Sequence, residues 1–114
     1  MGEHLDPELL AELEVIMEEE FPTLLETFLA DAQKHYQQIG STWRNDDLDG
    51  LRRSAHSLKG SSANIGAGAL AELCSTLEAQ AHARETGSTE ACIRLLSREL
   101  EAVCAEIRTR LTAA

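Results

Sequence analysis

The chain has 114 residues, which fits one domain spanning residues 1–114 and is too short for a large α/β enzyme. A net charge of −10 argues against a general nucleic-acid binder and against docking on anionic lipid. No apolar run approaches the roughly 20 residues that a bilayer span needs, and leucine, alanine and glutamate, all strong helix formers, dominate the composition. We therefore expect an all-α protein.

Five helices are predicted by apolar residues that recur at steps of three and four. In chain order they span about residues 6–20, 22–43, 47–64, 69–85 and 89–111. Asp6 and Asp47 are suited to cap helix starts, and Gly66 or Gly68 can supply the positive φ that ends the third helix. The segment Thr86-Gly87-Ser88 should break the chain between the last two helices.

Four of these helices are long and their connections are short, so an antiparallel up-down four-helix bundle is the simplest architecture. The additional short N-terminal helix should cap one end of that bundle. Its apolar side chains follow helical spacing, and those near its C-terminal end are Leu13, Ile16 and Met17.

The cysteines Cys74, Cys92 and Cys104 are odd in number, lie far apart and occupy apolar helical positions. We expect buried, reduced thiols rather than disulfides or a zinc site.

The N-terminus has no basic region followed by an apolar stretch, so we expect no signal peptide and a cytoplasmic location. The start at Met1 and the lack of linker sequence favour a free-standing protein.

The charge is spread unevenly along the chain. Residues 1–20 hold eight acidic residues and no lysine or arginine, whereas residues 50–71 hold no acidic residue but carry Arg52, Arg53 and Lys59. A positive window in so acidic a protein indicates a site that meets negative charge, although a chance cluster on a solvated face is the alternative.

His56 lies inside this positive window. At about 100° per residue it points about 130° away from the apolar stripe of its helix, so it is not a core histidine. Lys59 and Gly60 follow at i+3 and i+4, the positions that neighbour His56 on a helix surface. A mid-helix glycine costs about 1 kcal/mol relative to alanine, and one reason for it is to leave the ring uncovered. Ser61 and Ser62, which are small and polar, should keep the neighbourhood open.

An exposed histidine with a neighbouring lysine and cleared space suits a nucleophile for phosphoryl transfer, because neutral imidazole has a free lone pair near pH 7. The alternatives are an ordinary surface histidine on an adaptor helix and a helical metalloenzyme. The second is disfavoured because none of the four histidines has a glutamate three residues before it.

A known family shares this pattern. Residues 56–62 read His-Ser-Leu-Lys-Gly-Ser-Ser, residues 63–70 continue through two glycines, and residues 74–78 read Cys-Ser-Thr-Leu-Glu. This run closely resembles the signature of histidine-containing phosphotransfer (HPt) domains. The resemblance implies a four-helix bundle that acts as a phosphocarrier between receiver domains of response regulators and hybrid sensor histidine kinases.

The resemblance also implies roles for single residues. His56 matches the phospho-accepting position, with Nε2 as the attacking atom, while Lys59 matches the lysine beside the phosphate and Gly60 the clearing glycine. Glu78 falls where the family has a Gln or Glu that hydrogen-bonds the other ring nitrogen, and about 75° off its own stripe it is placed to reach a neighbouring helix. A solvated glutamate is the alternative.

Receiver docking is less clearly marked in the sequence. Ser57 replaces a larger residue found in some relatives, and Arg52 lies one turn before His56, where it can receive an anion or remain solvated. Docking should use apolar residues around His56, with Leu13, Ile16 or Met17 of the first helix contributing; the alternative is that these three residues simply seal the bundle end. Arg52, Ser57 and Ser61 are the other candidates for this docking surface.

The chain contains no P-loop and no glycine-rich kinase loop, so we expect a carrier without autokinase activity. We also expect no cofactor of its own, because Mg²⁺ would be held by the partner receiver, and we expect a monomer.

Overall fold

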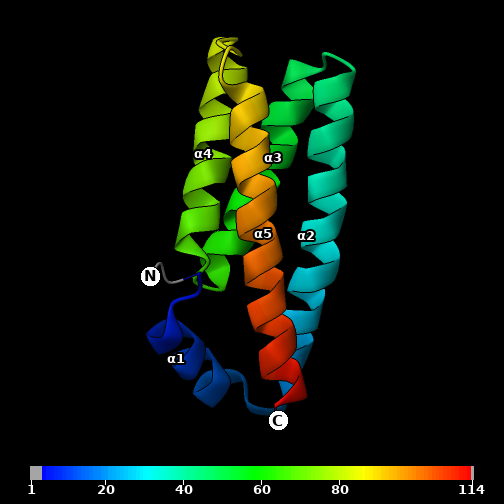
Figure 1. Cartoon of the computed structure of the whole chain (residues 1–114). Coiled ribbons are helices and arrows are strands. Elements are labelled where there is room, and N and C mark those ends of the chain that lie inside the picture. Colours follow the sequence, from blue (N-terminus) through cyan, green and yellow to red (C-terminus); the bar gives the residue numbers. More distant parts are fainter. Residues whose placement is uncertain (1–3, 114) are drawn as a thin grey trace.

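The computed structural model describes residues 4–113, which are helical apart from short connections and contain no strand (Figure 1). The helices are α1 (Pro7–Met17), α2 (Phe21–Arg44), α3 (Leu48–Asn64), α4 (Gly68–Ala83) and α5 (Thr89–Thr112), with a 3-10 helix (Glu18–Glu20) between α1 and α2.

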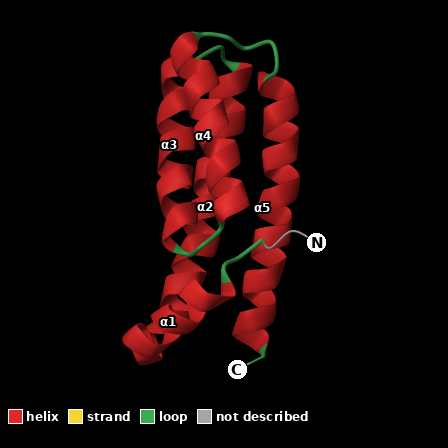
Figure 2. Ribbon diagram, turned by 90° about the vertical axis from the view of Figure 1, so that its left-hand side faces the viewer, coloured by secondary structure: helices red, strands yellow, loops and turns green. Residues whose placement is uncertain are grey.

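Helices α2 to α5 run alternately up and down and form an antiparallel four-helix bundle (Figures 1 and 2). Consecutive helices pack against each other, and α5 closes the bundle against α2. The molecule measures 42 × 26 × 20 Å along its principal axes. The predicted fold class is therefore confirmed, and α3 lies between α2 and α4.

The start and the direction of α3 follow from its sequence. The Asp47 side chain caps the helix by accepting a hydrogen bond of 2.9 Å from the backbone N–H of Gly50. Leu51, Ala55 and Leu58 then recur on one face and are fully buried. Because these residues hold one face in the core, the opposite face of α3 is left to solvent.

The core is contributed by all five α-helices, with Leu10 from α1, together with Leu5 before α1 and the connection between α3 and α4. The three cysteines are free and buried within it, as expected. Burial raises the pKa of the Cys74 thiol to about 12 and also raises the pKa of Cys92 and of Cys104. Since the thiolate is the reactive form, these thiols are structural. The largest fully buried side chains are Leu5, Leu10, Leu25, Ile39, Leu51, Leu58, Ile65, Leu70, Leu77, Leu96, Val103 and Ile107.

The N-terminal segment is fixed to the end of the bundle at which α3 and α4 are joined (Figure 1). Asp6 caps α1 by accepting from the backbone N–H groups of Glu8 and Leu9, and its own N–H donates to the Gly66 carbonyl at 2.9 Å. Gly66 has φ +79°, and a Cβ there would lie 2.9 Å from the Cβ of Asp6. Only glycine permits both this backbone conformation and this close approach. The short α1 thereby lies across the end of the bundle, as predicted.

Some details differ from the sequence-based expectations. α1 ends at Met17 and α4 at Ala83, where Arg84 takes a left-handed conformation and ends the helix before the predicted break. Gly68 does not end α3, because it is the first residue of α4. Leu95 belongs to the apolar stripe that predicts the last helix, and the spacing of that stripe predicts that it faces inward. It is instead 52% exposed, since it lies about 100° around the helix from the buried Leu96.

Candidate functional site

His56 lies near the middle of α3, on the face that the core residues leave to solvent. Its neighbours Ala55 and Leu58 are fully buried, whereas the His56 side chain is 65% exposed. Among residues 4–113, no group forms a hydrogen bond with its Nε2 atom. The outward direction predicted from helical spacing is therefore correct.

A carboxylate from α4 holds the other ring nitrogen. Glu78 Oε2 lies 2.9 Å from His56 Nδ1. Because an ionised carboxylate only accepts hydrogen bonds, Nδ1 carries the proton and donates it. In the neutral ring this leaves the Nε2 lone pair directed to solvent. The contact expected from the resemblance is present, and it brings together residues 22 positions apart.

The same carboxylate also holds Lys59. The ammonium Nζ lies 2.8 Å from Glu78 Oε1, so the two oxygens of one glutamate bind the ring and the ammonium separately. Helical spacing places Lys59 beside His56, but it gives no indication of this ion pair, which depends on how α3 and α4 pack. Lys59 was therefore predicted to lie beside a bound phosphate, but its partner in the unmodified chain, Glu78, was not predicted.

The electrostatics of Glu78 follow from these two contacts. The hydrogen bond from Lys59 is the largest influence on the pKa of Glu78 and lowers it from its ordinary value. Partial burial acts in the opposite direction, and the hydrogen bond with His56 adds to the lowering of the pKa. Glu78 is thus ionised at neutral pH and can accept from both partners.

Gly60 leaves the space beside the ring open. A Cβ built on Gly60 would meet no atom within 4 Å. Local packing therefore does not require a glycine here, and the expected cleared space one turn after His56 is present. Ser61, the next residue, is half-buried and its hydroxyl donates to the Ser57 carbonyl within α3 at 3.2 Å. The expectation for Ser62 was wrong, because Ser62 is fully buried and its hydroxyl donates to the Leu58 carbonyl at 2.7 Å.

An open hollow of about 420 Å³ lies along the groove between α3 and α4. Arg52 and His82 line it together with Lys59 and Glu78, so three basic side chains surround one carboxylate. Arg52 was a candidate from the sequence, whereas His82 was not. The signal was available, because His82 is four residues after Glu78 and therefore on the same face of α4.

Ser57 lies on the other side of α3. It lines a separate hollow of about 310 Å³ with Arg53 and residues of α2, on the side away from Glu78. The structure therefore does not bring Ser57 into the group formed by His56, Lys59 and Glu78. The positive window divides accordingly, with Arg52 and Lys59 near α4 and Arg53 near α2.

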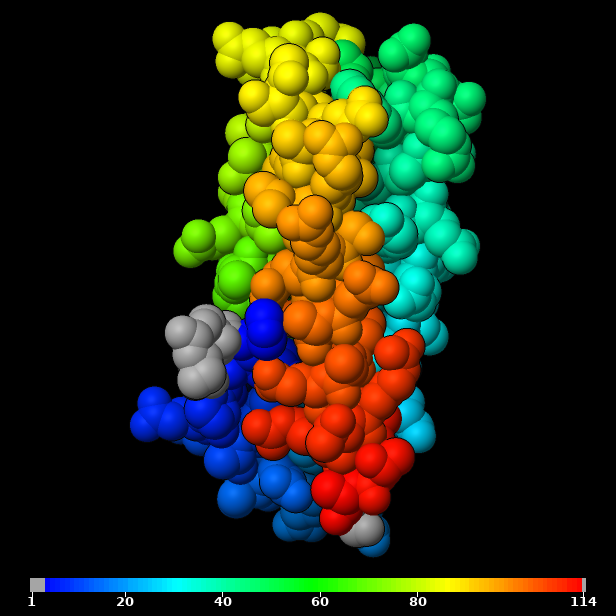
Figure 3. Space-filling model, in the orientation of Figure 1, coloured from blue at the N-terminus to red at the C-terminus, as the bar shows by residue number. Residues whose placement is uncertain are grey.

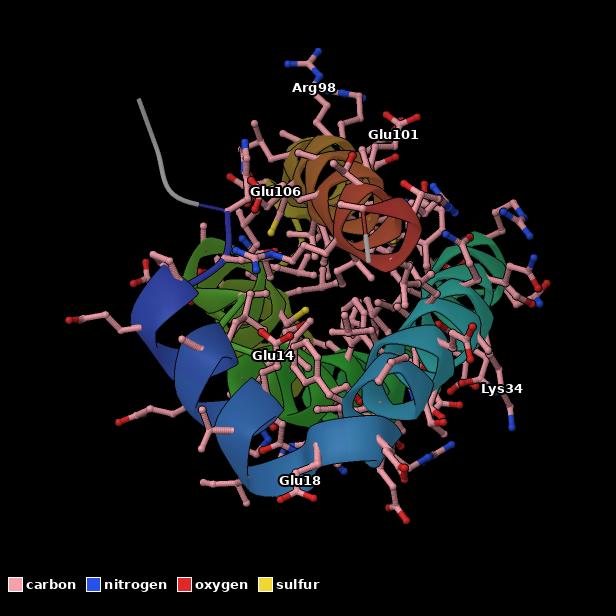
Figure 4. All side chains as sticks on the ribbon, turned by 90° about the horizontal axis from the view of Figure 1, so that it is seen from below. Glu14, Glu18, Lys34, Arg98, Glu101 and Glu106 are labelled. Carbon is pink, nitrogen blue, oxygen red and sulfur yellow. The ribbon has the colours of Figure 1, made fainter. Side chains whose placement is uncertain are left out.

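The three docking candidates on α1 have different surroundings. Leu13 and Met17 are half-buried and pack against the core, so they seal the bundle end. Ile16 is 75% exposed and does not. Seen from below, Glu14 points across the end of the bundle, whereas Glu18 points away from it (Figure 4).

Among residues 4–113 no three His, Cys, Asp or Glu side chains gather as they would around a metal ion. Within the same range, no helix combines the length and the apolar character that crossing a bilayer requires.

The fold and the site together define a class of protein: a small antiparallel helical bundle that presents one oriented histidine to a partner. The model of the Hpt domain family matches residues 23–110, and the chain belongs to this family. Hpt proteins are phosphocarriers rather than enzymes, so this chain is a phosphotransfer carrier of two-component signalling that interacts with receiver domains.

A solved structure supports this assignment. The chain is similar to histidine-containing phosphotransfer protein B (HptB) from Pseudomonas aeruginosa PAO1, with a TM-score of 0.96 and 34% sequence identity, over 100% of this chain and 99% of that one. None of the curated proteins matches the chain.

Proposed function

We propose that His56 accepts a phosphoryl group from the aspartyl phosphate of one receiver domain and passes it to the aspartate of another. The observation that carries this proposal is the orientation of a single ring: Glu78 holds Nδ1–H, and Nε2 stands exposed beside a cleared position. Such a ring presents its lone pair to an incoming partner without rearrangement.

In the transfer step, the Nε2 lone pair attacks phosphorus. The N–P bond forms while the P–O bond to the receiver's aspartate breaks, and the aspartate leaves as a carboxylate. Nδ1 keeps its proton, and the positive charge that develops on the ring faces the Glu78 carboxylate. Transfer to a second receiver reverses these bond changes.

Other residues take supporting roles in this proposal. Lys59 and Arg52 compensate the charge of the phosphoryl oxygens, and Gly60 gives the partner access to the ring. Ile16, Ser57 and Ser61 contribute to the receiver-docking surface, whereas Leu13 and Met17 belong to the bundle end that they seal.

The partners are receiver domains of response regulators and of hybrid sensor histidine kinases. The chain has no autokinase activity and holds no cofactor of its own, because the receiver supplies Mg²⁺. It works as a cytoplasmic monomer.

The test is to mix the purified chain with aspartyl-phosphorylated receiver domains and to look for label that is acid-labile and base-stable. The wild-type chain should take up label and return it to a second receiver, and His56→Gln should take up none. His4→Gln is the matched control, because His4 also contacts a glutamate through Nδ1, and it should be labelled normally. Binding of receivers without any label would identify an adaptor instead.

A further inference from the structure

Glu78 binds two groups that both take part in the proposed transfer. Oε2 accepts from the His56 ring at 2.9 Å, and Oε1 pairs with the Lys59 ammonium at 2.8 Å. In the unmodified chain the charge of Lys59 is therefore already compensated by a neighbouring carboxylate.

A phosphoryl group on Nε2 would offer Lys59 a second acceptor. Lys59 lies three residues after His56 on the same helix, and its flexible side chain is 34% exposed, so the ammonium can change partners without displacing α3. The phosphoryl group carries three acceptor oxygens and up to two negative charges, more than a single carboxylate offers.

We propose that Lys59 exchanges partners on phosphorylation, moving from Glu78 to the phosphoryl oxygens while Glu78 keeps its hydrogen bond to the ring. This inference rests on the proposed function of His56. Whatever Lys59 gains at the phosphoryl group is reduced by what it loses at Glu78. Glu78 thus limits how strongly Lys59 stabilises phosphohistidine, and this keeps the phosphoryl group transferable.

A glutamine at position 78 separates the two contacts. Its amide oxygen can still accept from Nδ1–H, so the ring can remain oriented, but a neutral amide cannot form an ion pair with the ammonium. In Glu78→Gln, Lys59 would give up no ion pair on moving to the phosphoryl group. Removing Lys59 should therefore weaken phosphorylation more in Glu78→Gln than in the wild-type chain.

The experiment is a double-mutant cycle on the phosphorylation equilibrium. Wild type, Lys59→Met, Glu78→Gln and the double variant are each equilibrated with one aspartyl-phosphorylated receiver that labels the wild-type chain. The ratio of phosphorylated to unphosphorylated protein gives the equilibrium constant. Methionine keeps the apolar stem of the lysine and removes its charge.

We expect Lys59→Met to lower the equilibrium constant of phosphorylation in both backgrounds. The reduction should be about two- to five-fold larger in the Glu78→Gln background than in the wild-type background, because a partly exposed ion pair contributes a free energy of that size. An equal or smaller factor in the Glu78→Gln background would overturn the partner exchange while leaving the proposed function intact. If no receiver labels the wild-type chain, the proposed function itself fails, and the inference fails with it.

Two controls keep the result specific. The first control is the same double-mutant cycle with Glu90→Gln and Arg94→Met, which remove an exposed ion pair within α5. Arg94→Met should change the equilibrium constant of phosphorylation equally in the wild-type and Glu90→Gln backgrounds. Urea unfolding of every unphosphorylated variant establishes that each one is folded.

Discussion

Two histidines of this chain contact a glutamate in the same way. His4 Nδ1 lies 2.8 Å from Glu99 Oε2, and His56 Nδ1 lies 2.9 Å from Glu78 Oε2. In both pairs the glutamate is the less exposed partner. What differs is the structure around each pair.

His4 precedes α1 and joins the N-terminal segment to α5, next to the buried Leu5. In Figure 3 the N-terminal segment, in blue, lies against α5, in orange. His56 lies within a long helix, its glutamate also holds Lys59, and the position one turn later is glycine. A histidine–glutamate contact therefore does not define a transfer site. The second contact of the carboxylate and the cleared approach distinguish His56 from His4.

The largest expected effect of the predictions below comes from filling the cleared position. Gly60→Gln should slow transfer by about 10- to 100-fold, because a side chain there obstructs a partner that must approach the ring closely. The same change should raise helix stability by about 0.5–1 kcal/mol, since a mid-helix glycine is replaced and its Cβ meets no atom. Transfer rates from a phosphorylated receiver and urea unfolding measure the two effects.

Gly87→Gln is the matched control, because a Cβ on Gly87 also meets nothing within 4 Å but this residue lies in the loop between α4 and α5. It should transfer at the wild-type rate. Wild-type transfer rates for Gly60→Gln would instead mean that the cleared space has no role in transfer. Only the second contact of the Glu78 carboxylate would then distinguish His56 from His4.

The second prediction concerns the segment that His4 helps to hold. Gly66→Ala should lower the free energy of unfolding by about 1–3 kcal/mol, because φ is +79° and the new Cβ would press on Asp6 and Leu9. Urea unfolding measures this loss. Gly68→Ala, where a Cβ meets nothing, is the control and should lose no stability. If both variants unfold alike, the close approach at Gly66 is not what fixes the N-terminal segment.

The third and smallest expected effect tests the carboxylate between His56 and Lys59. The pKa of Glu78 in the folded chain lies below its ordinary value of 4.5, so its contacts stabilise the fold fully above pH 4.5. That contribution is lost as the pH falls through the lowered pKa. At neutral pH the wild-type chain should exceed Glu78→Gln by about 0.2–1 kcal/mol.

Urea unfolding of both proteins at pH 7 and pH 3 measures this difference, and other carboxylates largely cancel in the comparison. The advantage of the wild-type chain should shrink at pH 3. An unchanged difference would show that the charge of Glu78 adds nothing to the fold.

Much of the fold followed from local pattern. Asp6 and Asp47 cap their helices as predicted, and Leu51, Ala55 and Leu58 fix which face of α3 is buried. Such features depend on neighbours within four residues, where helical geometry is the same in every protein. Errors occurred where packing decides, as at Leu95, whose exposure depends on how α5 is rotated against its neighbours.

The candidate site, like the fold, could be predicted from the sequence only where it depends on spacing within one helix. Spacing along α3 placed His56, Lys59 and Gly60 together, but Glu78 entered only through a family resemblance. Nothing in the sequence indicated the contact between Glu78 and Lys59 or the pair formed by His4 and Glu99. His82 was overlooked, although its spacing from Glu78 places both on one face of α4.

The sequence by itself determined that the chain forms helices, where most of them begin, and that one histidine points outward beside a lysine and a glycine. Only the tertiary structure decided that a carboxylate of α4 reaches both the imidazole and the ammonium. The physical reason is that residue spacing sets directions within one helix, whereas the offset and rotation between two helices are set by side chains packed along their whole length.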